Sequence, residues 1–131
     1  MSEKQRVLSP FLSLLRGSDG IVAVMDEAWT EPDELSFGDL VLNEATHEVR
    51  RGGARVDLTP TEFNLLRFFL LNPRRVLSKQ HILDRVWDEA FGGDPTIVET
   101  YVSYLRRKLD PLGPRLIHTV RFVGYALRDD A

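Results

Sequence analysis

The sequence predicts an α+β domain in which short strands come first, three helices follow and a β-hairpin comes last. Three observations support this order. Residues 35–58 alternate apolar and polar side chains between turn residues, as half-buried strands do. Residues 59–109 hold three stretches whose apolar side chains recur at helical spacing. Residues 115–128 then return to two short strand-like runs around a turn.

The first strand-like stretch is LSFGDLVLN, residues 35–43, which leads into a turn over residues 43–47. HEVRRGG, residues 47–53, then passes through Gly52-Gly53 into ARVDL, residues 54–58. A glycine pair between two strand-like runs is typical of a β-hairpin. We therefore expect a small antiparallel sheet at this end of the domain.

The first helix has a clear start and stop. Thr59 is a suitable N-cap, Pro60 takes the first helical position and Glu62 completes a capping box. Asn72-Pro73 ends the helix. Its inward face is formed by Phe63, Leu66 and Leu70, widened by Leu65 and Phe69. The amides of the first turn could also receive a phosphate, but capping alone accounts for the threonine.

The second helix follows a short extended piece at residues 76–77 and has Ser78 as its N-cap. Its expected inward residues are Ile82, Leu83, Val86 and Trp87. The loop 88–95 contains a glycine pair, and Asp94 is expected to cap a third helix that runs to about Leu109. Two helices joined by a loop, with a hairpin directly behind them, form a winged helix-turn-helix arrangement.

The third helix presents two faces. Its core stripe consists of Val98, Val102, Leu105 and Leu109, which step by 4, 3 and 4. A second face, one residue earlier, consists of Ile97, Tyr101, Tyr104 and Lys108, with Thr100 beside it. Phenol, hydroxyl and ammonium groups suit base edges and phosphate oxygens in a major groove. Alternatively, the tyrosines cover the core and the cations at 106–108 balance the helix dipole; this helix alone does not decide.

The hairpin turn adds a second place where nucleic acid could be contacted. Thr119 and Arg121 lie at this turn, and a projecting cation can enter a minor groove. A single arginine in a turn is also often just solvated. The combination of helix and turn favours DNA binding more than either element does alone.

Composition limits the other possibilities. The chain has 131 residues, 43% of them hydrophobic, which fits one main domain at 35–131 preceded by an acidic segment, 1–34. Residues 1–34 carry 3 Lys/Arg and 7 Asp/Glu, a net charge of -4. Residues 35–131 carry the other 14 Lys/Arg and 13 Asp/Glu, a net charge of +1. No cysteine and no metal-type histidine spacing is present, so we expect no metal, no cofactor and no enzyme. No apolar run is long enough to cross a bilayer, and we expect a cytoplasmic protein.

Three segments carry a resemblance to a known family: DLTPTEFNLLRFFLLNPRRVLSKQHILDRVW, VETYVSYLRRKLD and RLIHTVRFVGYALR. Together they resemble the C-terminal effector domain of OmpR/PhoB-type response regulators, which belong to two-component systems. The resemblance covers about residues 35–130. It implies a winged helix-turn-helix with a four-stranded antiparallel N-terminal sheet, three helices and a C-terminal hairpin wing. It also implies sequence-specific binding of double-stranded promoter DNA, with the recognition helix in the major groove and the wing in the minor groove.

The resemblance also implies site residues and partners. Family members commonly bind direct repeats as head-to-tail pairs, and the loop after the second helix contacts RNA polymerase. In this chain that loop would contribute Asp88, Glu89 and Asp94. The positions implied for DNA contact are Trp87, Thr96, Thr100, Tyr101, Ser103, Tyr104, Arg106, Arg107, Lys108, Thr119 and Arg121.

The sequence departs from the family pattern in three places. Ser103 and Tyr104 replace two arginines that are frequent in mid-helix, so base readout is expected to use hydroxyl and stacking contacts more than charge. Phe122 replaces the first glycine of the usual wing pattern, so we expect a reshaped tip or a ring packed on the sheet or on DNA sugars. The family's N-terminal receiver has no counterpart in residues 1–34, so we expect no phosphoacceptor.

A second function remains open at this point. The tyrosine-bearing face could bind another protein, which would make the domain an interaction module that does not contact DNA directly. The acidic residues 26–34 and the modest charge of the main domain keep this alternative.

Overall fold

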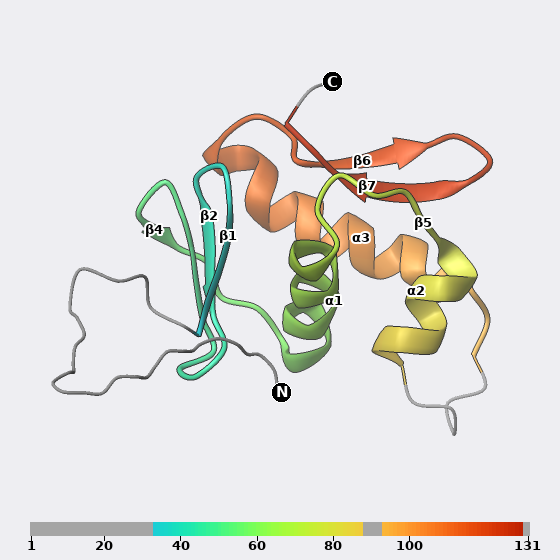
Figure 1. Ribbon diagram of the computed structural model, residues 1–131, viewed down its shortest axis with the longest axis horizontal. Coiled ribbons are helices and arrows are strands. Elements are labelled where there is room, and N and C mark those ends of the chain that lie inside the picture. The colour runs from blue at the N-terminus through green and yellow to red at the C-terminus, as the bar shows by residue number, and fades with distance from the viewer. Residues whose placement is uncertain (1–32, 88–92, 130–131) are drawn as a thin grey trace, which may run out of the picture. The chain divides into compact units, whose positions relative to one another are not determined.

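The computed structural model describes residues 33–87 and 93–129, and its elements follow the predicted order (Figure 1). A four-stranded sheet comes first, three α-helices follow, and the hairpin β6–β7 closes the described chain. This confirms the predicted α+β winged-helix fold. Most of the acidic segment, residues 1–32, lies outside the described residues.

The N-terminal sheet has the strand order β1-β2-β3-β4. Its strands are β1 (Glu34–Phe37), β2 (Leu40–Asn43), β3 (Glu48–Arg51) and β4 (Ala54–Arg55). The stretch 35–43 is divided between two strands, because Gly38 turns the chain with a φ of 59°. β2 and β3 are antiparallel, with Leu42 opposite Val49, and both side chains are buried. One face of this sheet therefore contributes to the core.

α1 (Pro60–Leu71) begins with the predicted capping box. The Glu62 N–H donates to Thr59 Oγ1 over 3.3 Å, and the Thr59 N–H donates to Glu62 Oε1 over 2.9 Å. Two of the first-turn amide groups are thus satisfied within the chain. The helix ends as expected at Asn72, and its predicted apolar face is buried.

α2 (Lys79–Val86) and α3 (Thr96–Leu109) form the helix-turn-helix pair. Ser78 caps α2 as predicted, accepting the His81 N–H over 3.0 Å. Trp87 is the C-cap of α2 and not part of the helix, and it is half-buried and packs against the core as predicted. At α3 the N-cap position is Pro95, but Asp94 Oδ1 still accepts the Thr96 N–H over 3.0 Å. The aspartate therefore caps the helix from one residue further back.

The C-terminal sheet has one strand more than the predicted hairpin. β6 (Ile117–Val120) and β7 (Gly124–Leu127) form the hairpin, and β5 (Leu77–Ser78) pairs with the other edge of β7. Gly124 lies opposite Ser78 in this pairing. A Cβ atom on Gly124 would lie 1.9 Å from the Leu77 carbonyl oxygen, so only glycine permits this close approach.

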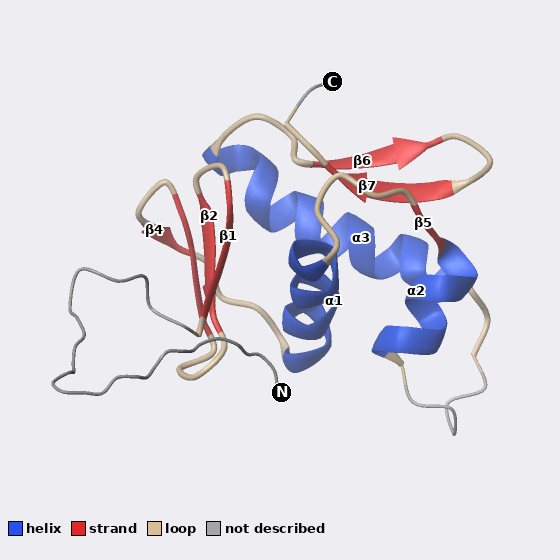
Figure 2. Ribbon diagram, in the orientation of Figure 1, coloured by secondary structure: helices blue, strands red, loops and turns tan. Residues whose placement is uncertain are grey.

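α3 is the element that brings the two halves together. It contacts both α1 and α2, and Figure 2 shows it running behind them with the C-terminal sheet above it in this view. Its C-terminal end is tied to the first sheet by Arg51, whose side chain is only 1% exposed. The Arg51 guanidinium donates to the carbonyl oxygens of Leu109 and Pro114, and it pairs with Asp39.

No helix within the described ranges is long and apolar enough to cross a membrane. Those same residues bring together no group of three or more His, Asp or Glu side chains that could hold a metal ion.

Candidate nucleic-acid interface

The buried stripe of α3 lies where the sequence places it. Val98, Val102, Leu105 and Leu109 are each at most 1% exposed. They fix the rotation of the helix about its own axis, because all four must face the core. Every other side chain of α3 therefore has a determined direction.

The side of α3 roughly opposite this stripe is exposed. It carries Thr96, Thr100, Ser103 and Arg107, which step by 4, 3 and 4 along the helix, and all four are exposed. We call these four residues the outward face. It offers three hydroxyl groups and one guanidinium to solvent. The face that the sequence singled out, with Tyr101 and Lys108, is instead a flank between the stripe and the outward face.

The two tyrosines of this flank are partly covered by the domain. The Tyr101 ring is half-buried and meets the Trp87 ring edge-on, with 5.4 Å between their centroids. Tyr104 packs edge-on against Tyr101 at 5.2 Å and is 36% exposed. Three rings thus form a row from the end of α2 along α3. The row supports Tyr104, whose exposed part borders the outward face.

Lys108 makes contacts that the sequence did not predict. Its ammonium donates to Glu62 Oε1 over 2.6 Å and to the Asp57 carbonyl oxygen over 2.8 Å. Burial alone would raise the pKa of the Glu62 carboxyl, but the hydrogen bonds from Lys108 and from the Thr59 N–H outweigh this, and the pKa is lowered. Lys108 therefore joins the end of α3 to the start of α1, where the expectation was a bare ammonium.

Arg106 also contacts its own domain. Its Nε donates to the Ile117 carbonyl oxygen over 3.0 Å, and its Nη2 donates to Thr119 Oγ1 over 2.8 Å. Its guanidinium carbon lies 5.5 Å from the centroid of the Tyr125 ring. These contacts attach α3 to both strands of the wing. Arg106 thus holds the wing in position relative to α3.

Arg107 is differently placed. Among the described residues it has no hydrogen bond or ion pair; its guanidinium carbon lies 5.5 Å from the exposed Tyr104 ring. The same is true of Arg121 at the wing tip, whose guanidinium carbon lies 5.0 Å from the Phe122 ring centroid. Two arginines therefore remain able to donate all their N–H groups to a ligand.

The wing tip keeps the backbone that a glycine would adopt. Phe122 has a φ of 68°, and its ring is 95% exposed, so it does not pack on the sheet. Thr119 near the end of β6 and Arg121 in the turn are exposed as well. The backbone of the tip is thus not reshaped, and the difference from a glycine at this position is the exposed ring.

The loop between α2 and α3 is described only at its end. Asp88 and Glu89 lie outside the described residues, and Asp94 is exposed while its side chain caps α3. A further contact, which the sequence did not signal, joins the two helices: Lys79 Nζ lies 2.6 Å from Glu99 Oε2. This hydrogen bond raises the pKa of Lys79. The two residues are 20 positions apart, and no local pattern connects them.

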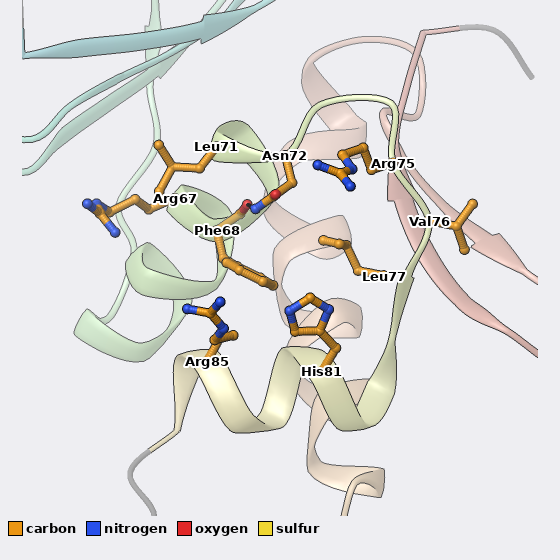
Figure 3. A pocket seen from close by; sticks show the side chains of 9 residues that line it. All are labelled: Arg67, Phe68, Leu71, Asn72, Arg75, Val76, Leu77, His81 and Arg85. Atoms are coloured by element: carbon orange, nitrogen blue, oxygen red, sulfur yellow. Dashed lines mark hydrogen bonds between the residues drawn. The ribbon is translucent and has the colours of Figure 1, made fainter. Parts of the chain in front are cut away.

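A cleft on another part of the domain brings together none of the predicted contact residues. Figure 3 shows its lining between α1 and α2, where the Phe68 ring meets His81 edge-on at 5.6 Å. Its lining comprises Arg67, Phe68, Leu71, Asn72, Arg75, Val76, Leu77, His81 and Arg85. These residues belong to α1, to α2 and to the connection between them, which includes β5, so none of them lies on the outward face or in the hairpin β6–β7.

Comparison with known families identifies this arrangement. A family model described as "Transcriptional regulatory protein, C terminal" matches residues 53–127, more than half of the chain. The probable transcriptional regulatory protein TcrX of Mycobacterium tuberculosis is 57% identical over 95 residues, which cover 72% of this chain and 41% of that protein. Transcriptional regulatory protein TrcR of the same organism is 46% identical over 124 residues, which cover 95% of this chain and 46% of that protein. The chain thus spans less than half the length of these relatives.

Solved structures agree in fold. The C-terminal domain of the nisin resistance regulator NsrR superimposes with a TM-score of 0.65 at 35% identity, covering 75% of this chain and all of that one. The Thermotoga maritima OmpR/PhoB homologue DrrB superimposes with a TM-score of 0.65 at 29% identity, covering 76% of this chain and 46% of that one. The Klebsiella pneumoniae RstA DNA-binding domain, solved in complex with the RstA box, gives 0.61 at 28%, covering 72% and 96%. This chain therefore belongs to the family of transcriptional regulatory protein C-terminal domains, the winged-helix DNA-binding effector domains of OmpR/PhoB-type response regulators.

Proposed function

We propose that this chain binds double-stranded promoter DNA with the outward face of α3 in the major groove and the wing tip in the minor groove. One observation carries the proposal: α3 leaves a continuous hydroxyl and guanidinium face uncovered, on the helix whose other sides are held by the domain. The similar RstA domain, which was solved in complex with its RstA box, supports DNA binding by this chain.

The outward face has suitable chemistry for reading bases. The hydroxyls of Thr100 and Ser103 can donate to or accept from base edges, and the Thr100 methyl can contact a thymine methyl. Arg107 can donate two parallel hydrogen bonds to a phosphate or to a guanine edge. Tyr104 borders this face and can add stacking or hydroxyl contacts. The Thr96 hydroxyl, at the start of the helix, can donate to a phosphate.

Residues that face inward support this surface indirectly. Arg106 holds the wing, Lys108 holds the end of α3, and the Trp87–Tyr101 contact holds Tyr104. We infer that Arg106, Lys108, Trp87 and Tyr101 act mainly by positioning the interface. At the wing, Thr119 and Arg121 are exposed, and a guanidinium is attracted to the negative potential of a narrow minor groove.

Two expectations about partners stay predictions. Residues 88–94 would contact RNA polymerase through Asp88, Glu89 and Asp94, of which Asp94 alone is described. Head-to-tail pairs on direct repeats would require a duplex with two sites in tandem. The alternative of a protein-only interaction module would use the tyrosine flank, but Tyr101 of that flank already packs against Trp87.

The test is a titration of the chain with a duplex selected from a random pool, repeated over a range of salt concentrations. We expect log affinity to fall linearly with log salt, with a slope of about -0.9 for each phosphate neutralised. We also expect the selected duplex to bind at least ~1000-fold more tightly than random duplex. A flat salt response, or equal affinity for selected and random duplexes, would exclude sequence-specific DNA binding.

A further inference from the structure

The turn of the wing has a backbone that suits glycine, yet a phenylalanine occupies it. The Val123 N–H donates to the Val120 carbonyl oxygen over 2.9 Å, so residues 120–123 form a β-turn. Phe122 is its third residue and has a φ of 68°. Because Arg121 has no positive φ, this is the pattern of a type II turn, whose third position normally requires glycine. A bulky side chain in this conformation strains the backbone.

The ring gains nothing visible from its own domain in return. It is 95% exposed, and the neighbouring Val123 is 54% exposed. The Arg121 guanidinium lies over the ring, with its carbon 5.0 Å from the ring centroid. The strained backbone opposes stability of the free domain, and the exposed ring contributes no apolar burial that would offset the strain. Strained residues of this kind are characteristic of sites that contact a ligand.

The position of the turn is fixed relative to α3. Gly124, next to the turn, pairs with Ser78 at the start of α2, and Thr119 accepts a hydrogen bond from Arg106 of α3. Lys79 and Glu99 join the starts of these two helices. The ring is therefore carried on a rigid hairpin beside the recognition helix. A duplex held by the outward face of α3 would present its adjacent minor groove to this hairpin.

We propose that Phe122 is a DNA-contacting residue whose ring packs against the deoxyribose walls of the minor groove while Arg121 reaches toward its floor. This inference rests on the proposed function and adds an apolar contact to it. Apolar side chains inserted at the minor groove are an established means of binding DNA, and a guanidinium beside them supplies the charge. DNA is preferred over a protein partner because the cation Arg121 is stacked on the ring and the Thr119 hydroxyl lies at the same turn.

The experiment compares Phe122→Gly and Phe122→Asn with wild type, since both residues tolerate the left-handed backbone but remove the ring. Affinity is measured on a selected duplex that carries a single site, together with thermal unfolding of the free chain. We expect Phe122→Gly to raise the melting temperature by roughly 5 °C through relief of strain. We expect the same substitution to weaken DNA binding roughly tenfold through loss of apolar burial. Phe122→Leu, which keeps an apolar side chain, should lose less affinity than either.

Salt dependence separates the ring from the arginine beside it. Phe122→Gly removes no charge, so its log–log salt slope should equal that of wild type, whereas Arg121→Gln should lower the slope by about 0.9. Single-site affinity equal to wild type in Phe122→Gly would overturn the inference. Loss confined to a duplex with two tandem sites would also overturn it, and would assign the ring to a second copy of the chain. If wild type shows no salt-dependent duplex binding at all, the proposed function fails first and this inference fails with it.

Discussion

Four cations, three at the end of α3 and one at the wing tip, are chemically alike but have different surroundings. Arg106 and Lys108 donate to oxygen acceptors of their own domain, on the wing and at the start of α1. Arg107 and Arg121 lie instead over exposed aromatic rings, which leaves their N–H groups available. We call the first pair the inner cations and the second pair the outer cations. The comparison shows that sequence neighbours such as Arg106 and Arg107 can have completely different contacts, and we propose that these contacts decide the role of each cation.

The largest expected effect is a loss of stability on substitution of Arg51. This deeply buried cation, like the inner cations, donates to oxygen acceptors of its own domain. Arg51→Met should lower the free energy of unfolding by about 3 kcal/mol, because it leaves the Leu109 and Pro114 carbonyl oxygens without their donor. Urea unfolding followed by circular dichroism measures this. The matched control is Arg50→Met, since Arg50 is exposed and pairs only with surface groups, and it should change stability by less than about 0.5 kcal/mol. Equal effects of the two substitutions would contradict the account.

The outer cations should show the opposite behaviour. Arg107→Gln combined with Arg121→Gln should weaken duplex binding roughly tenfold or more, since two charge-assisted contacts are lost. Stability should stay within about 0.5 kcal/mol of wild type, because neither guanidinium bonds to a described part of the domain. Fluorescence anisotropy and urea unfolding on the same preparation give both numbers. Destabilisation of the double variant by more than about 1 kcal/mol would move these residues into the inner set.

A smaller effect concerns pH at the junction of α1 and α3. The pKa of Glu62 is lowered in the folded domain, so the unfolded chain binds its proton more readily. The stability that Glu62 contributes is therefore fully present above its ordinary pKa of 4.5 and is lost as pH falls through the folded value. Glu62→Gln should reduce the slope of stability against pH in this acidic range. Unfolding curves between pH 7 and pH 3 that keep the wild-type slope would show that the carboxylate is not coupled to Lys108.

The smallest effect on affinity is expected from removing hydroxyls of the outward face, and this effect should depend most on the DNA sequence. Thr100→Val and Ser103→Ala should change which duplexes are selected from a random pool, while binding to random duplex stays nearly constant. Glu99→Gln provides a control on the same helix, because Glu99 is directed to Lys79. Unchanged preferences in the threonine and serine variants would remove these hydroxyls from base readout.

Local patterns predicted a large part of this fold. The capping box at Thr59, the Ser78 cap and the apolar stripe of α3 depend on residues within one or two turns, and each is found as predicted. The split of the first strand at Gly38 and the addition of β5 to the wing were not predicted. Both depend on turn conformation or on pairing with a strand about 45 residues away, which no local pattern records.

The site was less predictable than the fold for the same reason. Lys108 meets Glu62 from 46 positions away, and Arg106 meets Thr119 from 13. Helical spacing places Lys108 beside the tyrosines, but it cannot show that Glu62 of α1 lies close enough to accept a hydrogen bond from Lys108. The outward face itself was recoverable, because its four residues lie roughly opposite the apolar stripe. Sequence reasoning favoured the tyrosine flank because aromatic and cationic side chains together looked more like a binding surface.

The most direct test of the division into inner and outer cations is the salt dependence of duplex binding in two single variants of α3. Arg107→Gln should lower the magnitude of the log–log slope by about 0.9, the contribution of one phosphate. Lys108→Gln should leave the slope within about 0.3 of wild type, because its ammonium is held by Glu62 and the Asp57 carbonyl. A reduced slope for Lys108→Gln with an unchanged slope for Arg107→Gln would contradict the central claim.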